Sequence, residues 1–108
     1  MADNVNHPSH YEASTSIECI EAMVAMFGDY PVRSFCLCNA YKYIWRHKNK
    51  NGLEDLQKAQ WYLDKAKELG EEIDVGIKIL FPEYVPPLVT LQKLLDEKTK
   101  QWQESDHS

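Results

Sequence analysis

Hydrophobic residues recur every three to four positions in four stretches of the chain, which is the spacing of one face of an α-helix. In the first stretch, Thr15 or Ser16 can cap the helix start, because Thr15-x-x-Glu18 fits a capping box, and Gly28 offers a stop. The later stretches predict helices at about 31–48, 53–69 and 88–104. The periodicity therefore predicts an all-α fold.

The second predicted helix is apolar on two sides. One stripe consists of Val32, Phe35, Cys36, Asn39 and Tyr43, and the opposite stripe consists of Leu37, Tyr41, Ile44 and Trp45. A helix that is apolar all round is usually central in a domain, or shared between a core and a partner subunit. The aromatic surplus around Tyr41 and Trp45 therefore predicts a homo-oligomer.

The third predicted helix follows a short NKNG connection, where Asn51 can serve as its cap, and Gly70 is expected to end it. Such a short connection predicts an antiparallel hairpin of the second and third helices. The apolar positions within 72–81 fit a short strand and a short helix equally well, and Pro82, Pro86 and Pro87 interrupt the rest of the segment 71–87. We expect one domain, 1–108, with an N-terminal arm (1–13), a three-helix core (14–70), an irregular connector (71–87) and a C-terminal helix (88–104).

Charge is distributed unevenly along the chain. The formal net charge is −5, yet no Asp or Glu lies between Tyr30 and Leu53. The cations of this window are Arg33, Lys42, Arg46, Lys48 and Lys50. Local positive charge on an acidic protein suits a compact anionic ligand better than a long polyanion, so the composition argues against nucleic acid as a partner.

The remaining composition indicates a cytoplasmic protein. No apolar run approaches the roughly 20 residues that a membrane-spanning helix needs, and the N-terminus lacks the cationic and apolar segments of a secretory signal. Three cysteines without the spacing of a disulfide framework are typical of reduced thiols. Cys36 and Cys38 are expected to be small buried residues, because thiols two positions apart on a helix point in nearly opposite directions.

Helical spacing places a group of polar side chains on facing sides of the hairpin. On the second helix these are Asn39, Lys42, Tyr43 and Arg46, and on the third they are Asp55, Lys58 and Tyr62. Lys42 and Arg46 would donate charge-assisted hydrogen bonds to phosphate oxygens. Asn39 could recognise a base or sugar edge, and Tyr43 or Tyr62 could stack on a base. Asp55 could orient Arg46, bind a sugar hydroxyl or act as a base.

The same charges are also typical of helix ends that bind no ligand. Cations near a helix C-terminus and acids at the next N-terminus are each favoured by roughly 0.3–1 kcal/mol. This explanation does not account for Asn39 within an apolar stripe, where an unpaired amide is costly.

The N-terminal arm carries His7, His10 and Tyr11 in the sequence HPSHY. These residues could pack over the domain, could contribute to a ligand pocket, or could begin a metal site. No Cys or carboxylate spacing completes such a metal site, so no metal is expected.

Three separated blocks resemble a family of small phage and prophage proteins: HPSHY, ECIEAM and NAYKYIWRHKNKNGLEDLQKAQWYL. Its members are commonly labelled uncharacterised or nucleotide kinase, the latter after a coliphage enzyme that resembles them. The resemblance covers about residues 7–64. It implies a characteristic set of residues: His7, Pro8, His10, Tyr11, Glu18, Asn39, Lys42, Tyr43, Arg46, Lys50, Glu54, Asp55, Lys58 and Tyr62. The family usually has glycine immediately before the asparagine, where this chain has Cys38.

The pocket and the resemblance together lead us to expect a phage-derived nucleotide- or phosphate-binding protein in the host cytoplasm. One form would be a nucleoside monophosphate kinase without a P-loop. In that enzyme Lys42 and Arg46 would neutralise the transferring phosphoryl group, assisted by Lys50 or Lys58, and Asp55 would orient or deprotonate the acceptor. No resident cofactor is expected, and Mg²⁺ bound with the nucleotide is compatible with this scheme.

Two alternatives belong to other functional classes. A binder without turnover would sequester a nucleotide immune signal, and it would return its ligand intact after denaturation. A protein–protein interaction module would bind through the second apolar face of the 31–48 helix and would ignore nucleotides.

Overall fold

The computed structural model describes the backbone of residues 13–104 and the side chains of residues 19–104. Its elements are α1 (Ala13–Phe27), α2 (Asp29–Arg46), the short 3₁₀ helix η1 (His47–Asn49), α3 (Leu53–Leu80) and α4 (Pro87–Glu104). There is no strand among the described residues, and the predicted all-α fold is confirmed. No helix in this part of the chain combines the length and the apolar character needed to cross a membrane.

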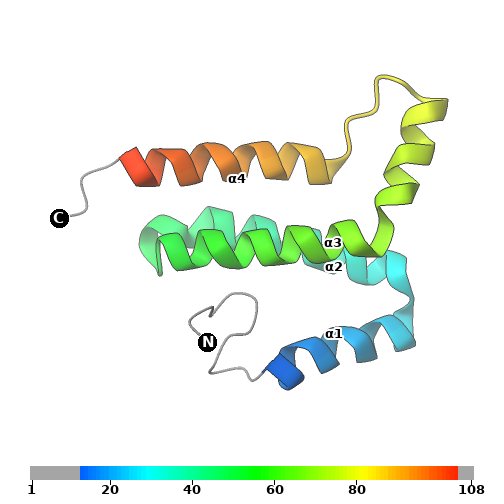
Figure 1. The fold of residues 1–108 in the computed structure, drawn as a ribbon, viewed down its shortest axis with the longest axis horizontal. Helices are drawn as coiled ribbons and strands as arrows, with labels where there is room; N and C mark the ends of the chain where they lie inside the picture. The colour runs from blue at the N-terminus through cyan, green and yellow to red at the C-terminus, as the bar shows by residue number, and fades with distance from the viewer. Residues whose placement is uncertain (1–12, 105–108) are drawn as a thin grey trace.

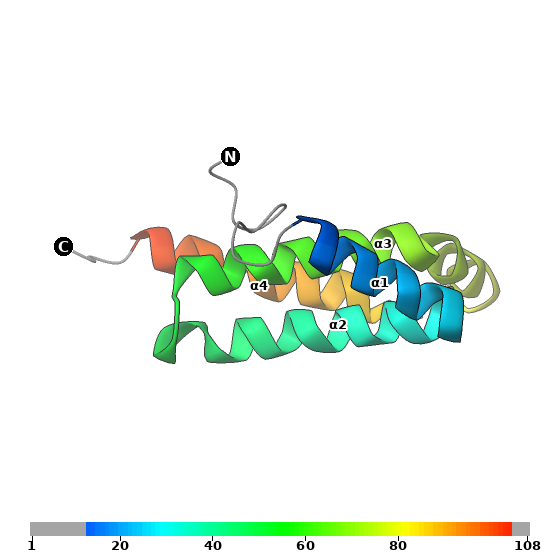
Figure 2. The same ribbon diagram turned by 90° about the horizontal axis from the view of Figure 1, so that it is seen from below.

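The antiparallel pair of α2 and α3 forms the centre of the molecule. In Figure 1, α4 runs along one side of this hairpin and α1 along the other. Figure 2 shows the arrangement after a quarter turn: α2 lies along one edge, and the other three helices lie to one side of it. The predicted hairpin is therefore the scaffold on which the two remaining helices pack.

Two clusters of buried residues join the helices. The larger one, between α2, α3 and α4, contains Ala40, Tyr43, Ile44, Leu56, Ala59, Leu63 and Leu95. The second, which brings in α1, contains Ile20, Val32, Cys36 and Ala66. Small residues such as Ala40, Ala59 and Ala66 have no exposed surface, so the backbones of α2 and α3 can approach closely at their shared face.

The first helix begins earlier than its capping pattern predicts. It starts at Ala13, which places Thr15 and Ser16 inside the helix rather than at its cap. Its predicted end is confirmed, because α1 stops at Phe27, immediately before Gly28. The second helix also starts two residues early, at Asp29.

The turn between α2 and α3 is built around Gly52, and the prediction of Asn51 as the cap of α3 is wrong. Gly52 precedes the helix with φ 58°, a left-handed torsion that favours glycine. The Trp102 ring of α4 also packs directly on it: a Cβ atom at this position would lie 2.5 Å from Cη2 of that ring. A residue with a side chain could not satisfy both conditions, so glycine allows α4 to close over the hairpin turn.

His47 completes the packing of this turn. The side chain is buried, and its Nδ1–H donates to the carbonyl oxygen of Ile44 at 2.6 Å. The imidazole meets the Trp102 ring edge-on at a centroid distance of 6.2 Å. The C-terminal part of α4 thus packs on η1 and on the turn that leads into α3.

The third helix does not end at Gly70, and the prediction of an irregular connector over 71–87 is wrong for residues 71–80. Gly70 departs from helical torsions (φ −179°, ψ 28°), and the helix resumes beyond it as far as Leu80. In Figure 1 the tail of α3 turns away from the hairpin at this kink. The physical reason lies in Arg33: its side chain packs against the bare Cα of Gly70 and forms an ion pair with Asp74, one turn further along α3.

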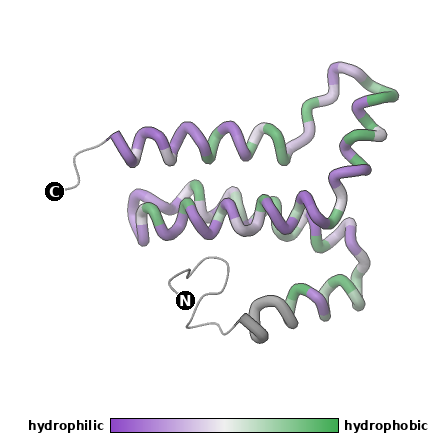
Figure 3. The backbone as a smooth tube through the Cα atoms, viewed as in Figure 1, coloured by the Kyte–Doolittle hydropathy of each residue, from purple (hydrophilic) through white to green (hydrophobic). Residues whose placement is uncertain are grey.

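The elbow between the α3 tail and α4 is rich in exposed apolar residues. Figure 3 shows hydrophobic positions concentrated where α3 ends. Ile79, Leu80 and Phe81 are all largely exposed there. These residues lie outside both buried clusters.

Replacement of Gly70 by alanine tests the packing at the kink. A Cβ atom would lie 2.6 Å from Cδ and 3.0 Å from Nε of Arg33, which is buried and tied to Asp74. We expect Gly70→Ala to lower the free energy of unfolding by about 1–3 kcal/mol, measured by urea denaturation. Gly76→Ala is the matched control, since its Cβ position meets no atom within 4 Å apart from the adjacent residues and the local helix backbone. It should raise stability by about 0.5–1 kcal/mol. Equal stabilisation by both substitutions would contradict the packing of Arg33 on Gly70.

Candidate functional site

Three cations surround the ring of Tyr43. Lys42 Nζ lies 4.6 Å from the ring centroid and Arg46 Cζ lies 4.9 Å from it. Lys58 Nζ, from α3, lies 5.7 Å from the same centroid. All three distances fall within the range of about 6 Å for cation–π attraction. The structure therefore brings together the cations that helical spacing places on facing sides of the hairpin, and we call this group the Tyr43 cluster.

Asp55 fixes the guanidinium of Arg46. Arg46 Nε donates to Oδ2 of Asp55 at 3.3 Å, and Arg46 Nη2 donates to Oδ1 at 3.4 Å. The backbone N–H of Asn51 also donates to Oδ2, at 3.1 Å. Asp55 stands in the first turn of α3, where the helix dipole favours a negative charge. Its carboxylate thus links the end of α2, the turn and the start of α3.

The burial of Asp55 limits what its carboxylate can do. The side chain has no exposed surface, and three N–H donors from Arg46 and Asn51 surround its two oxygens. Of the roles that the sequence leaves open, orientation of Arg46 is the one this geometry supports. Direct contact with a ligand would require the hydrogen bonds around the carboxylate to rearrange.

The other two cations differ in their partners. Lys58 forms an ion pair with Glu54 at 3.4 Å, within one helical turn of α3. Lys42 is exposed, and no carboxylate of the described residues lies within ion-pair distance of it. Among the side chains that the structure describes, three positive charges thus face two negative ones at this site, and Lys42 is the most exposed of the three cations.

Tyr62 backs the Tyr43 ring from α3. The two rings stack with centroids 5.9 Å apart and an interplanar angle of 15°. Trp61 and Phe35 meet Tyr62 edge-on, at 5.0 Å and 6.4 Å. The predicted pair of phenols is therefore part of an aromatic stack that supports the cations. Stacking of a ligand base on either ring remains a prediction.

Asn39 lies one turn before Tyr43 on α2 and is half-buried. Within the described residues its side-chain amide makes no hydrogen bond, so both its donor and its acceptor are available at the edge of the cluster. Lys50 is exposed in the turn that follows η1, next to Asn51.

The predicted contributions of the N-terminal arm cannot be placed. His7, His10 and Tyr11 lie outside the described residues, and so does the side chain of Glu18.

A second buried ion pair, between Arg33 and Asp74, was not anticipated from the sequence. The partners are 41 positions apart and both are buried. Tyr84 donates its hydroxyl proton to Oδ1 of Asp74 at 3.3 Å. Partial burial of the phenol and the neighbouring Asp74 carboxylate raise the pKa of Tyr84. In the sequence, Asp74 lies between the apolar residues Ile73 and Val75, which suggests a buried charge. Spacing along one helix cannot identify its partner, because Arg33 is 41 positions away.

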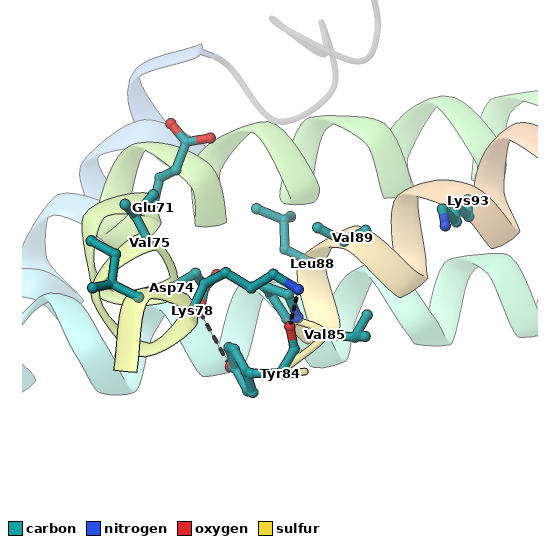
Figure 4. A pocket seen from close by; sticks show the side chains of 11 residues that line it. Glu71, Asp74, Val75, Lys78, Tyr84, Val85, Leu88, Val89 and Lys93 are labelled. Atoms are coloured by element: carbon teal, nitrogen blue, oxygen red, sulfur yellow. Dashed lines mark hydrogen bonds between the residues drawn. The ribbon is translucent and has the colours of Figure 1, made fainter. Parts of the chain in front are cut away.

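An open groove, to whose lining Asp74 contributes, lies at the elbow of α3 and α4 (Figure 4). It has a volume of about 530 Å³, and its walls are largely apolar: Val75, Ile79, Val85, Leu88 and Val89. Lys78 spans one side and donates from Nζ to the carbonyl oxygen of Tyr84 at 2.9 Å. The groove is formed by the α3 tail and α4, whereas the Tyr43 cluster is formed by α2 and the N-terminal half of α3.

The cysteines show no arrangement for nucleophilic catalysis. Cys36 is fully buried, and burial raises the pKa of its thiol to about 11, which keeps it protonated at neutral pH. The predicted burial of Cys38 is wrong: this residue is exposed, because its side of α2 faces away from α3. Cys19 is exposed as well.

The chain belongs to a protein family that is described only as being of unknown function, DUF3310. The family model matches residues 5–64, more than half of the chain. The match ends just beyond Tyr62, so it includes every member of the Tyr43 cluster but neither the α3 tail nor α4. Neither the curated proteins nor the solved structures contain a significant match to the chain.

The Asp55 contacts predict a large difference between two neighbouring acidic residues. Asp55→Asn leaves Arg46 without its buried counter-charge, which costs 3–5 kcal/mol for fully buried pairs. Because the Arg46 side chain is 34% exposed and can be rehydrated, we expect a smaller loss of about 2–3 kcal/mol in urea denaturation. Glu54→Gln is the matched control and should change stability by no more than about 0.5 kcal/mol, since the Glu54 side chain is 40% exposed and its pair with Lys58 spans one helical turn. Equal effects of the two substitutions would contradict the role given to Asp55.

Proposed function

We propose that the Tyr43 cluster binds a phosphorylated small molecule, and that a nucleotide is its natural ligand. The observation that carries this proposal is the convergence of Lys42, Arg46 and Lys58 on one tyrosine ring, where only two of the three cations have a carboxylate partner among the described side chains. Like charges held close together repel one another. A bound phosphate would relieve that repulsion and would accept hydrogen bonds from the cations.

Arg46 is preorganised for this task. Asp55 engages Nε and Nη2 of the guanidinium, whereas Nη1 makes no hydrogen bond to a described residue. A guanidinium held in place loses less conformational freedom when it binds phosphate than a free side chain would. Lys42 can move to meet the ligand from solvent, and Asn39, one helical turn before Tyr43 on α2, would offer its amide to a sugar or base edge.

We prefer a nucleotide over other phosphorylated molecules because aromatic rings and the Asn39 amide lie near the cations on the same helices. Aromatic rings and a half-buried amide one helical turn away suit a ligand that has a base and a sugar as well as a phosphate. The resemblance to phage proteins labelled nucleotide kinase agrees with this choice. Phage origin, location in the host cytoplasm and the nucleotide class all belong to the proposal.

Binding without turnover is favoured over a kinase reaction by the burial of Asp55. A general base must come within hydrogen-bond reach of the proton that it removes, and this carboxylate is enclosed by Arg46 and Asn51. In a kinase, Lys42 and Arg46 would neutralise the transferring phosphoryl group, and Mg²⁺ bound with the nucleotide would share that charge. The fate of the ligand distinguishes the two functions.

Thermal unfolding with mono-, tri- and cyclic nucleotides tests the proposal. A ligand at about 100 times its dissociation constant should add about 2.7 kcal/mol of stability, which is readily detected. Lys42→Ala should weaken binding at least about tenfold, because it removes a charge-assisted hydrogen bond from an exposed position without disturbing the core. Lys100→Ala, an equal change of charge on the exposed surface of α4, should leave the shift unchanged.

Analysis of the ligand recovered after denaturation then separates a binder from an enzyme. An intact nucleotide supports sequestration, and a phosphorylated or cleaved product supports a kinase or another transferase. If no nucleotide shifts the unfolding temperature, or if Lys42→Ala and Lys100→Ala behave alike, the Tyr43 cluster is not a nucleotide site.

A further inference from the structure

Trp102 is the only apolar residue between Asp96 and Glu104, at the C-terminal end of α4. This end of the helix lies beside the turn that joins α2 to α3 (Figure 1, Figure 2). The earlier part of α4 packs on the core through other side chains, among them Leu88 and Leu95. Trp102 therefore supplies the apolar contact of the C-terminal end.

The indole ring of Trp102 contacts this turn at two places. It lies on Gly52, where a Cβ atom would be 2.5 Å from Cη2 of the ring. It also meets the imidazole of His47 edge-on, at a centroid distance of 6.2 Å. The two contacted residues are joined to each other, because the N–H of Gly52 donates to the carbonyl oxygen of His47 at 2.8 Å. Trp102 thus packs against both ends of the segment 47–52.

The residues between these two contacts have little burial of their own. Positions 48–51 are all exposed, whereas His47 and Gly52 are buried. An exposed segment with few buried contacts opens more readily than the core does. The two buried ends, which share the indole as a neighbour, therefore set the conformation of the turn.

One N–H group of this exposed turn is used inside the protein. The backbone N–H of Asn51, the residue before Gly52, donates to Oδ2 of Asp55 at 3.1 Å. The same oxygen accepts a hydrogen bond from Nε of Arg46 at 3.3 Å, and the Asp55 side chain has no exposed surface. A buried carboxylate requires its hydrogen-bond donors to stay in place. The orientation of Arg46 therefore depends on where the turn holds Asn51.

We propose that Trp102 is a positioning residue of the Tyr43 cluster. By packing on both ends of the turn, it brings the N–H of Asn51 to Asp55 and so keeps Arg46 oriented for phosphate. Order that exists before binding strengthens an interaction, because less conformational freedom is lost when the ligand arrives. The link to binding rests on the proposed function, and Trp102 acts on it through the turn.

The C-terminal helix thereby gains a role at a site to which it contributes no cation. The three cations around Tyr43 come from α2 and α3, and the family match over residues 5–64 does not reach α4. A purely structural Trp102 would instead stabilise the whole domain and leave Arg46 unaffected. The two roles predict different results when another contact of α4 is weakened.

Hydrogen exchange in the free protein, followed by nuclear magnetic resonance, separates these roles. Trp102→Ala should accelerate exchange of the Asn51 backbone N–H and the Arg46 Nε–H about tenfold or more, because the turn opens locally. Trp102→Phe keeps an aromatic ring on Gly52 and should change both rates less than about threefold. Leu88→Ala is the matched control, since it removes core packing at the other end of α4. It should leave both rates within about twofold of the wild type.

Rates that Trp102→Ala leaves unchanged, or that Leu88→Ala accelerates equally, overturn the proposal. Trp102→Leu replaces the alanine variant if far-ultraviolet circular dichroism shows the latter to be unfolded. Leucine retains apolar volume but not the flat ring that lies on Gly52, so the same acceleration is expected.

Inorganic phosphate is the probe for the link to binding. In the wild type the Arg46 Nε–H resonance should shift in a saturable manner. Trp102→Ala should raise the dissociation constant about threefold or more, and Leu88→Ala should leave it unchanged. Faster exchange with an unchanged dissociation constant would overturn the proposal as well. If the wild type binds no phosphate, the proposed function fails, and the exchange rates alone decide whether Trp102 positions Arg46.

Discussion

The buried pairing of charges between α2 and α3 is the constraint on which the rest of the structure depends. Asp55 holds Arg46 and the N–H of Asn51 at one end of the hairpin, and Asp74 holds Arg33 at the other. Between these two ion pairs, small residues such as Ala40 and Ala59 allow close contact. Each carboxylate is out of water and requires its cation, so the two helices cannot slide or separate without exposing an unpaired charge.

This constraint gives α2 three distinct faces. One face supplies the core, a second presents Lys42 and Arg46 around Tyr43, and a third exposes Tyr41 and Trp45. Because Asp55 fixes Arg46, the cations are arranged before any ligand arrives, and the stack of Tyr43 on Tyr62 keeps their support rigid. The hairpin therefore presents the Tyr43 cluster and the exposed aromatic rings on different faces, both separate from the core.

Sequence periodicity predicted the features that depend on residues close together in the chain. Apolar spacing identified the four helices and the antiparallel hairpin, and i, i+3 and i+4 spacing brought Lys42, Tyr43 and Arg46 to one face. What it missed depends on contacts between distant residues. Gly70 suggests a helix end, but Arg33, 37 positions earlier in the chain, occupies the space of its missing side chain. Asn51 was a reasonable cap by composition, yet Gly52 is the residue that precedes α3. Trp102 of α4 packs on Gly52, and the backbone N–H of Asn51 donates to Asp55.

The central claim, that the Tyr43 cluster is the ligand site, is tested most directly by a nuclear magnetic resonance titration of the full chain with the nucleotide that stabilises it most. The account predicts that the Nε–H resonance of Arg46 and the ring resonances of Tyr43 shift in a saturable manner. The resonances of Val75 and Val89, in the groove at the elbow, should stay in place. Shifts confined to that groove, with Arg46 and Tyr43 unchanged, would contradict the account.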